Sequence, residues 1–382
     1  MRWLILCLIS LGVCFLSGST HACLWDNDTL EMERRAFPDT LELVTGKFVR
    51  HSPAYYRWRV DDRLRRMAEG ESNADLFDDL AVAYDKLGDQ QKAIDTILKK
   101  EELYPGEYET YANLGKFYIH SGEFEKGISH IDRAIEINPN AHFGREVYQR
   151  LLVEYVLTKR PGDEIVLPMD TDDLRGYSPV GFAKFLGEKG VFERHSDNEE
   201  AELKKAIQGV LGMMRFGHHD SPILLEALGD LLVGSGDLDD SGLLAARAYL
   251  KASYESADDS TKSAYRNLAE QSLVHRDQEY MLETLEVQFA KELAEADQWY
   301  EEIRANEEAW IAAGKNVDEQ FAITYYETPR VGEHAMDKIS AVSLTPWWRI
   351  MLRLFIAGGL LGISCYFGWR FFRARDQRVE PG

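Results

Sequence analysis

Two segments of the chain carry one residue pattern at a spacing of 34 residues. In chain order, Phe77, Leu80, Ala81, Tyr84, Gly88, Ala93 and Pro105 correspond to Tyr111, Leu114, Gly115, Tyr118, Gly122, Gly127 and Pro139. Within each copy these residues lie three and four positions apart, which predicts one apolar face of a helix, and a second helix follows after a short turn. A repeat of this length is typical of stacked helical hairpins, so the period largely decides the fold class.

Small residues in both copies fall where two helices would approach each other closely. Ala81 and Gly115 lie on the first helices, and Ala93 and Gly127 lie on the second helices. Larger side chains at such a crossing would separate the two helices. The shared glycine marks the turn of each copy, and the shared proline ends its second helix because proline cannot continue a helix.

The period and these residues resemble the tetratricopeptide repeat family over residues 74–140. The resemblance implies an all-α fold, a TPR-like α-solenoid of helical hairpins, with copies at 74–107 and 108–141. Lys100 departs from the family, which prefers a small residue at that position. A third copy is expected from Pro222 onwards, with Leu225, Leu228, Gly229, Leu232 and Gly236 at the offsets of its first helix and, after an insertion of four residues, Ala245, Tyr249 and Ala252 on its second.

One hairpin cannot bury its own apolar face, so further helices are expected on both sides of the two copies. Residues 23–73 predict an N-terminal helical cap, and the pattern after Pro139 predicts a capping helix that ends at 157. Residues 158–175 predict a linker, because prolines and a glycine interrupt the helical pattern there.

A divergent helical region is predicted at 176–315. It ends in one or two long amphipathic helices within 261–313, where proline and glycine are absent. These helices are expected to pack as the last pair of the solenoid, and a coiled-coil stalk is the alternative. Periodicity is lost at 316–346, which predicts an extended juxtamembrane spacer.

Residues 1–22 predict a secretory signal peptide that is cleaved after Ala22. An apolar stretch from Trp3 to Leu16 follows a single arginine, and small residues precede the cleavage position. The alternative is a retained membrane anchor, although about fourteen apolar residues fall short of the roughly twenty that span a bilayer. Cys23 would begin the mature chain, and its lipidation stays open.

Residues 347–370 predict one transmembrane helix with tryptophans at both ends. Four arginines follow its uncharged stretch and two precede it, so the basic tail at 371–382 is expected in the cytoplasm. The body would then be exoplasmic, or periplasmic in a bacterium. Gly358 and Gly362 have the spacing of a helix-dimerisation motif, which favours a homodimer; the alternative is that glycine is simply common in membrane helices.

Charge limits the partners of the predicted body. The chain has a formal net charge of −21, and removing the +1 of residues 1–22 and the +4 of residues 346–382 leaves −26 on residues 23–345. An acidic body repels nucleic acid and anionic lipid, so nucleic-acid binding is set aside and a basic partner is expected. Cys23 is the only cysteine of this segment, which excludes an internal disulfide.

No residue pattern supports a cofactor, a metal or a catalytic site. His218, His219 and Asp220 form the one compact cluster of metal-ligating types, but adjacent histidines point apart on a helix. Asp237, Asp239, Ser241 and Gly242 match half of a calcium loop whose final glutamate is replaced by Ala248. Asp170, Asp172 and Asp173 lack the loop glycine. Nucleophile, phosphate-binding and zinc-protease motifs are absent from the sequence.

The resemblance further implies a protein-binding groove formed by five positions of each first helix. The corresponding residues are Asp75, Asp78, Asp79, Val82 and Asp85 in the first copy and Glu109, Ala112, Asn113, Lys116 and Ile119 in the second. The first set is acidic, which favours a basic or amphipathic peptide as ligand. The alternative is that these aspartates form a solvated face.

The function implied is that of a non-enzymatic scaffold or adaptor, held outside the cytoplasmic membrane and binding other proteins. Two alternatives stay open. One is a helical enzyme acting on envelope components, with its site within 176–219, and the other is an assembly factor for a membrane complex.

Overall fold

The computed structural model describes residues 39–326, apart from 140, 161, 163, 172–173, 175–178, 195, 197, 236–240 and 274–281, and gives only the backbone of 142 and 143. The chain divides into two compact units, 1–329 and 330–382, and all described residues belong to the first. The predicted signal peptide, the transmembrane helix at 347–370 with its two glycines, and the basic tail lie outside the described residues. Within the described part, no helix has the length and apolar character needed to cross a bilayer.

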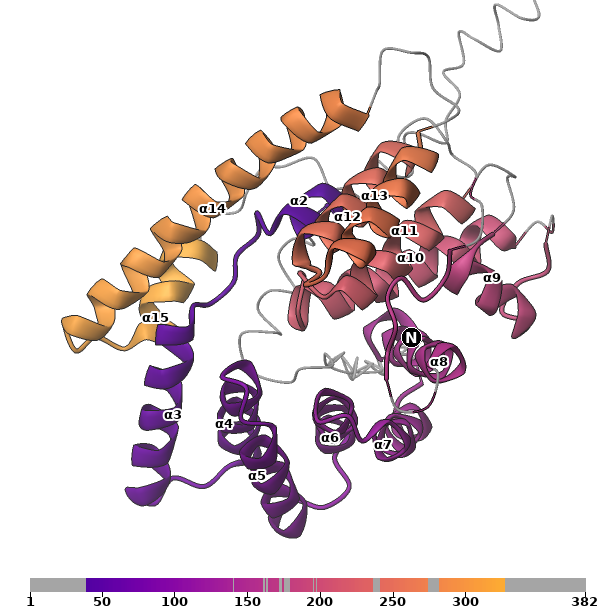
Figure 1. The fold of residues 1–382 in the computed structure, drawn as a ribbon. Coiled ribbons are helices and arrows are strands. Elements are labelled where there is room, and N and C mark those ends of the chain that lie inside the picture. The colour runs from indigo at the N-terminus through magenta and orange to yellow at the C-terminus, as the bar shows by residue number, and fades with distance from the viewer. Residues whose placement is uncertain are drawn as a thin grey trace, which may run out of the picture. The chain divides into compact units, whose positions relative to one another are not determined.

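Every regular element of the described residues is helical (Figure 1). The elements are α2 (Thr40–Thr45), α3 (Pro53–Ala68), α4 (Ala74–Lys86), α5 (Gln90–Leu103), α6 (Tyr108–His120), α7 (Phe124–Ile137), η1 (Ala141–Gly144), α8 (Arg145–Lys159), α9 (Gly181–Glu188), α10 (Glu199–Phe216), α11 (Pro222–Gly234), α12 (Ser241–Glu255), α13 (Asp259–Gln271), α14 (Leu282–Ala312), α15 (Val317–Phe321) and the π-helix η3 (Ala322–Tyr326). The chain is therefore all-α over these residues, and successive helices pack as hairpins.

The two repeats form the hairpins α4–α5 and α6–α7. Gly122 has a positive φ of 81°, which suits the turn between α6 and α7. A Cβ atom on Gly115 would lie 2.6 Å from Ile131 Cγ1, and one on Gly127 would lie 2.6 Å from Ile119 Cγ1. The small residues therefore stand where α6 and α7 cross, as the sequence predicts.

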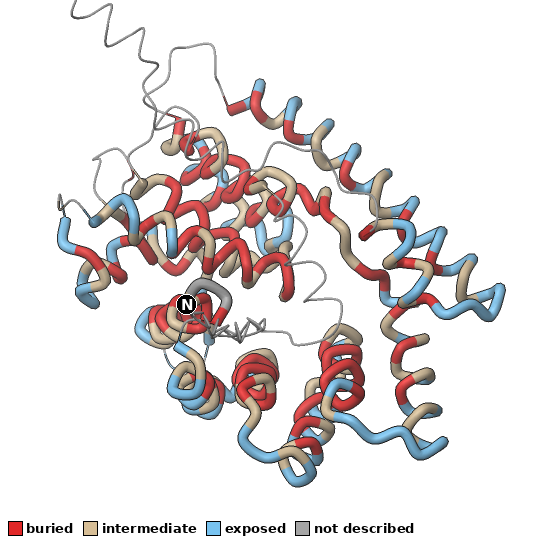
Figure 2. The backbone as a smooth tube through the Cα atoms, turned by 180° about the vertical axis from the view of Figure 1, so that it is seen from behind, coloured by how far each residue is buried: buried red, intermediate tan, exposed pale blue. Residues whose placement is uncertain are grey.

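The hairpin α11–α12 stands where the sequence predicts a third copy. Gly229 on α11 receives the ring of Tyr249 from α12, because a Cβ atom there would lie 2.6 Å from that ring. Both helices contribute to a large apolar core that extends from α8 to α13 and includes residues of α2 and of the first part of α14. In Figure 2 the buried residues of these helices face one another, and exposed residues lie mainly on the outer sides and at turns.

The C-terminal helices differ from their prediction. Helix α14 packs along α3, α2 and α15 instead of forming a last solenoid pair with α13. Its Ile303 lies in a second apolar core together with Phe321 and residues of the repeats. Residues 317–326, which the sequence predicts as extended spacer, are helical. Burial of Val317 and Phe321 stabilises a segment too short to show a helical period.

The N-terminal cap meets both the repeats and these last helices. Ser52 caps the first turn of α3, where Pro53 takes the first helical position. Helix α3 packs on α4 and α14. Within the predicted cap, α3 is therefore a helix that packs on the first repeat.

Candidate functional site

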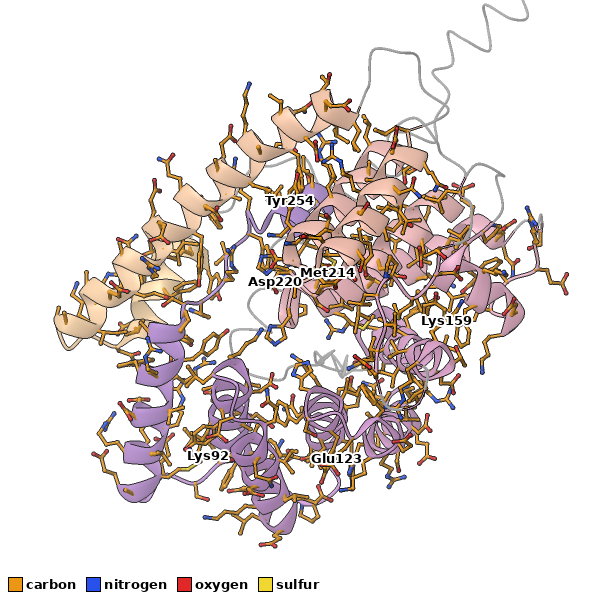
Figure 3. All side chains as sticks on the ribbon, viewed as in Figure 1. Lys92, Glu123, Lys159, Met214, Asp220 and Tyr254 are labelled. Atoms are coloured by element: carbon orange, nitrogen blue, oxygen red, sulfur yellow. The ribbon has the colours of Figure 1, made fainter. Side chains whose placement is uncertain are left out.

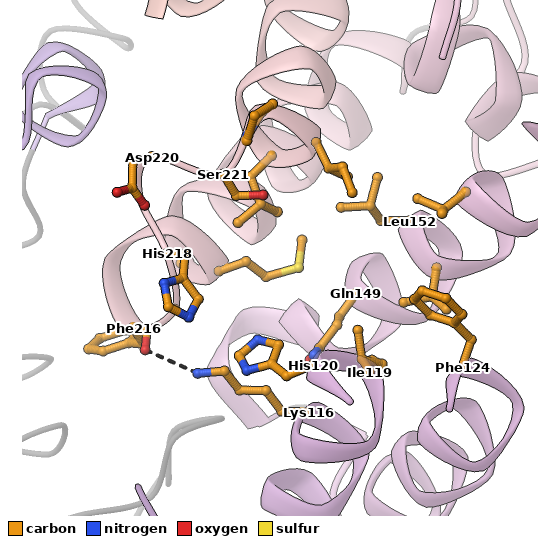
Figure 4. A pocket seen from close by; sticks show the side chains of 18 of the residues that line it. Lys116, Ile119, His120, Phe124, Gln149, Leu152, Phe216, His218, Asp220 and Ser221 are labelled. Atoms are coloured by element: carbon orange, nitrogen blue, oxygen red, sulfur yellow. Dashed lines mark hydrogen bonds between the residues drawn. The ribbon is translucent and has the colours of Figure 1, made fainter. Parts of the chain in front are cut away.

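A pocket with a volume of about 540 Å³ lies between α6 and α8 on one side and the end of α10 with the start of α11 on the other (Figure 4). Its apolar wall consists mainly of branched side chains and Met213. The lining residues used below are Lys116, Ile119, His120, Arg145, Gln149, Val153, Met213, Phe216, His218, Asp220, Ser221, Ile223 and Glu255. Ile119, Met213 and Ile223 are each partly exposed, so apolar surface is open to a ligand.

Close helix packing creates the floor of the pocket. A Cβ atom on Gly212 of α10 would lie 2.7 Å from Arg145 Cδ of α8. A Cβ atom on Gly209, one turn earlier, would lie 2.9 Å from the ring of Tyr148. These glycines therefore let α10 lie directly on α8, and side chains fill the contact between the helices.

Two lysines of the repeats hold the C-terminal end of α10. Lys86 Nζ of α4 donates a hydrogen bond to the carbonyl oxygen of Gly217 at 2.6 Å, and Lys116 Nζ of α6 donates one to that of Phe216 at 3.2 Å (Figure 4). The last carbonyls of a helix lack intrahelical partners and carry partial negative charge, so cations stabilise them. The concave side of the repeats thus already binds part of the chain itself.

Ionisable groups gather beside this contact. Asp85 accepts a hydrogen bond from His120 Nδ1 at 2.6 Å and lies 3.8 Å from Lys116 Nζ. Burial alone would raise the pKa of Asp85, but His120 and Lys116 outweigh it and hold that pKa below its usual value. The imidazole of His218 lies with its ring centroid 5.3 Å from that of His120. Desolvation, followed by the charges of Lys86 and Lys116, lowers the pKa of His218 to about 4.

The acidic groove predicted on α4 is largely closed. Asp78 accepts hydrogen bonds from Lys100 at 2.6 Å and Asn113 at 3.1 Å. Asp79 accepts one from Arg63 of α3 at 2.9 Å. Asp78, Asp79 and Asp85 are each buried to within 1 % of full burial. Their carboxylates therefore neutralise cations of this chain, and the structure does not present them as an open acidic surface.

The remaining predicted groove residues divide between core and surface. Val82 and Ala112 are buried in apolar clusters, Asp75 is exposed, and Glu109 is partly exposed. Lys116 and Ile119 are the two of the ten that line the pocket. The structure thus moves the candidate site from the first repeat toward the end of the second.

The pocket residues from α8, α10 and α11 were absent from the predicted groove, although those of α10 fall within the range 176–219 of the enzyme alternative. Lys116 and Phe216 are 100 positions apart, and no sequence period relates the repeats to α10. His120 stands next to a predicted groove position, Ile119, and that adjacency was the available signal.

The other predicted clusters do not converge. His218 faces His120, whereas His219 packs edge-on against Phe48 with ring centroids 5.4 Å apart. Asp220 lies at the turn between α10 and α11 (Figure 3). Asp170 pairs with Lys159, the last residue of α8, at 2.7 Å. Among the described residues, no group of three or more metal-ligating side chains has suitable geometry. Residues 237 and 239 of the calcium-like pattern, and residues 172 and 173, lie outside the described part.

Comparison with protein families gives a match within the second repeat. Residues 108–141, which comprise α6, α7 and the turn after them, match the family model of the tetratricopeptide repeat. No curated protein matches the chain.

Proposed function

Because residues 108–141 are a tetratricopeptide repeat, we propose that the chain is a protein-interaction module whose pocket receives an apolar segment of a partner protein. Repeats of this kind present surfaces to other proteins. The observation that supports the proposed place is the pocket of about 540 Å³, which opens partly exposed apolar side chains beside Lys116 and Ile119. Apolar concavities with a few converging polar groups are typical binding sites.

The setting proposed is a membrane-anchored scaffold. The predicted signal peptide and the predicted helix at 347–370 support a body outside the cytoplasmic membrane, where it would gather proteins of the envelope. A homodimer through Gly358 and Gly362 belongs to the same proposal. The net charge of the body and exposed Asp75 favour a basic partner for the surface outside the pocket, whereas the three buried aspartates no longer support one.

One observation favours the enzyme alternative: Met213, Phe216 and His218 of the predicted range line the pocket, and the pKa of His218 is lowered. An acid–base site would also require a nucleophile or substrate group next to the imidazoles. Within the described residues, the lining hydroxyl of Ser221 forms no hydrogen bond to His120 or His218. The arrangement therefore favours binding over catalysis.

Crosslinking from the pocket tests the proposal. A photoreactive amino acid replaces Met213 in the full chain, and a second chain carries it at Val287, an exposed residue on α14 with 62 % exposure. We expect a partner protein to be crosslinked from position 213 and not from 287, and to be lost when Ile223→Trp fills the pocket. Equal crosslinking in the presence of Ile223→Trp and of the surface control Val287→Trp would contradict a role for the pocket.

A further inference from the structure

Two imidazoles face each other at one edge of the pocket. The ring centroids of His120 and His218 are 5.3 Å apart, with an interplanar angle of 57°. His120 uses Nδ1 to bind Asp85, which leaves Nε2 on the opposite side of the ring. Within the described part of the chain, neither Nε2 of His120 nor the ring of His218 has a hydrogen-bond partner. The pair therefore has hydrogen-bonding capacity that the fold does not use.

Positive charge dominates around these rings. Lys86 from α4 and Lys116 from α6 both lower the pKa of His218, and His120 adds to the effect, whereas Asp85 opposes it. Arg145 of α8 lines the same pocket, with its guanidinium carbon 4.9 Å from the centre of the Phe216 ring. The local potential at the histidines is thus opposite in sign to the net charge of the chain.

The acidic residues of the pocket lining are directed to other cations. Glu255 pairs with Lys251 at 2.6 Å. Asp220 acts electrostatically on Arg50 and His219.

We infer that the pocket selects an acidic partner segment, in which an apolar side chain fills the cavity and an adjacent Asp or Glu carboxylate lies beside the nitrogen edges of His120 and His218. This inference rests on the proposed function and adds the chemistry of the ligand. The apolar wall supplies burial for the first group, and the cationic edge supplies charge complementarity for the second. The ligand inferred here is acidic, whereas the aspartates of α4 suggested a basic ligand.

A proton accompanies this binding mode. A carboxylate next to His218 counters Lys86, Lys116 and His120, so it raises the pKa of His218 from about 4 toward the ordinary value of histidine. The charged groups that face this ring are Lys86 and Asp85 of α4 and Lys116 and His120 of α6. The acidic segment should therefore bind more tightly at pH 6 than at pH 8, because the bound state takes up a proton.

Three matched peptides test the inference on the full chain. The probes are acetyl-Ala-Leu-Glu-Leu-Ala-amide and the same peptide with Gln or Lys in the middle, with binding followed by calorimetry and by the imidazole NMR signals of His120 and His218. We expect the Glu peptide to bind about fivefold more tightly than the Lys peptide, and the preference to shrink in high salt. Equal affinity, or a preference for Lys, would overturn the inference while leaving the pocket as a peptide site.

Variants of the full chain test whether His120 and His218 cause the preference for the Glu peptide. His120→Gln together with His218→Gln should abolish the preference for Glu, whereas His130→Gln, on the ring stacked against Tyr118 outside this pocket, should leave it unchanged. Ile223→Trp should abolish binding of all three peptides. If the unmodified chain binds none of them at millimolar concentration, the proposed function at this pocket fails and the inference fails with it.

Discussion

At the scale of single residues, buried charges decide what the first repeat exposes. Lys100 is fully buried at a position where the family prefers a small side chain, and its Nζ contacts Asp78 at 2.6 Å and Glu107 at 2.9 Å. A buried charge needs a partner, so the unusual lysine and the groove aspartate explain each other. The substitution of a small residue by lysine was the sequence signal that Asp78 is internal.

Removing one partner of this ion pair should destabilise the fold strongly. Asp78→Asn leaves Lys100 with only the partly exposed Glu107 as an anionic partner, and we expect a loss of up to about 3 kcal/mol in the free energy of unfolding. Replacing both groups, as Asp78→Leu with Lys100→Met, should cost much less because no charge stays buried. Urea unfolding measures both effects, with exposed Asp75→Asn as the control. A single variant as stable as that control would show that the pair is not buried.

At the scale of helices, α11 carries two buried carboxylates one turn apart. Asp230 accepts hydrogen bonds from the backbone N–H of Phe182 at 2.8 Å and from the hydroxyl of Tyr249 at 2.8 Å. Glu226 accepts them from the backbone N–H of Asp170 at 3.1 Å and from the hydroxyl of Tyr265 at 2.6 Å. Together they connect the start of α9 and the loop before it to the hairpin α11–α12, so the divergent region depends on polar contacts as well as on its apolar core.

These carboxylates predict a stability that falls with rising pH. Burial raises the pKa of Glu226 to about 8, to which the charge of Asp230 adds, and burial raises the pKa of Asp230 to about 7. Ordinary values are about 4, so between pH 4 and pH 8 the folded chain holds protons that the unfolded chain has released. The stabilisation is complete below about pH 4 and is lost as pH rises from there through the folded pKa values of about 7 and 8, by up to about 1.4 kcal/mol per proton and pH unit.

Thermal unfolding between pH 6 and pH 9 measures this dependence. The double variant Glu226→Gln with Asp230→Asn should flatten the decline, because neither amide titrates. Glu255→Gln, on an exposed carboxylate of α12, is the matched control and should leave the slope unchanged. The same slope in the double variant and the control would show that other groups cause the pH dependence.

At the scale of the described molecule, predictability follows sequence distance. The hairpins α4–α5 and α6–α7 could be predicted from the sequence, because the residues in contact where two helices cross, such as Gly115 and Ile131, lie within one period. The pocket and the burial of Asp79 could not be predicted in this way, because their contacts come from α10 and α3, and neither helix follows the repeat pattern. A family's groove positions describe an open surface, and here other helices of the chain cover much of it.

The contact of α14 and α15 with α3 joins segments about 250 residues apart, and Glu307 is its centre. This buried carboxylate lies 2.7 Å from His51 Nδ1 and accepts the backbone N–H of Ser52 at 2.9 Å, while Asp318 accepts the hydroxyl of Tyr55 at 2.7 Å. Glu307→Ala leaves His51 and Ser52 without this acceptor, which should cost about 1–3 kcal/mol locally.

Amide hydrogen exchange shows which helices lose stability in the variant Glu307→Ala. We expect faster exchange in α3, in α15 and in the second half of α14, because these helices share the contact, and unchanged exchange in α11 and α12, which belong to the other core. Glu308→Ala, an exposed neighbour on the same helix, is the control. Faster exchange throughout α11 and α12 would mean that the two cores unfold as one unit, and the contact with α3 would then support the whole described body instead of the first repeat alone.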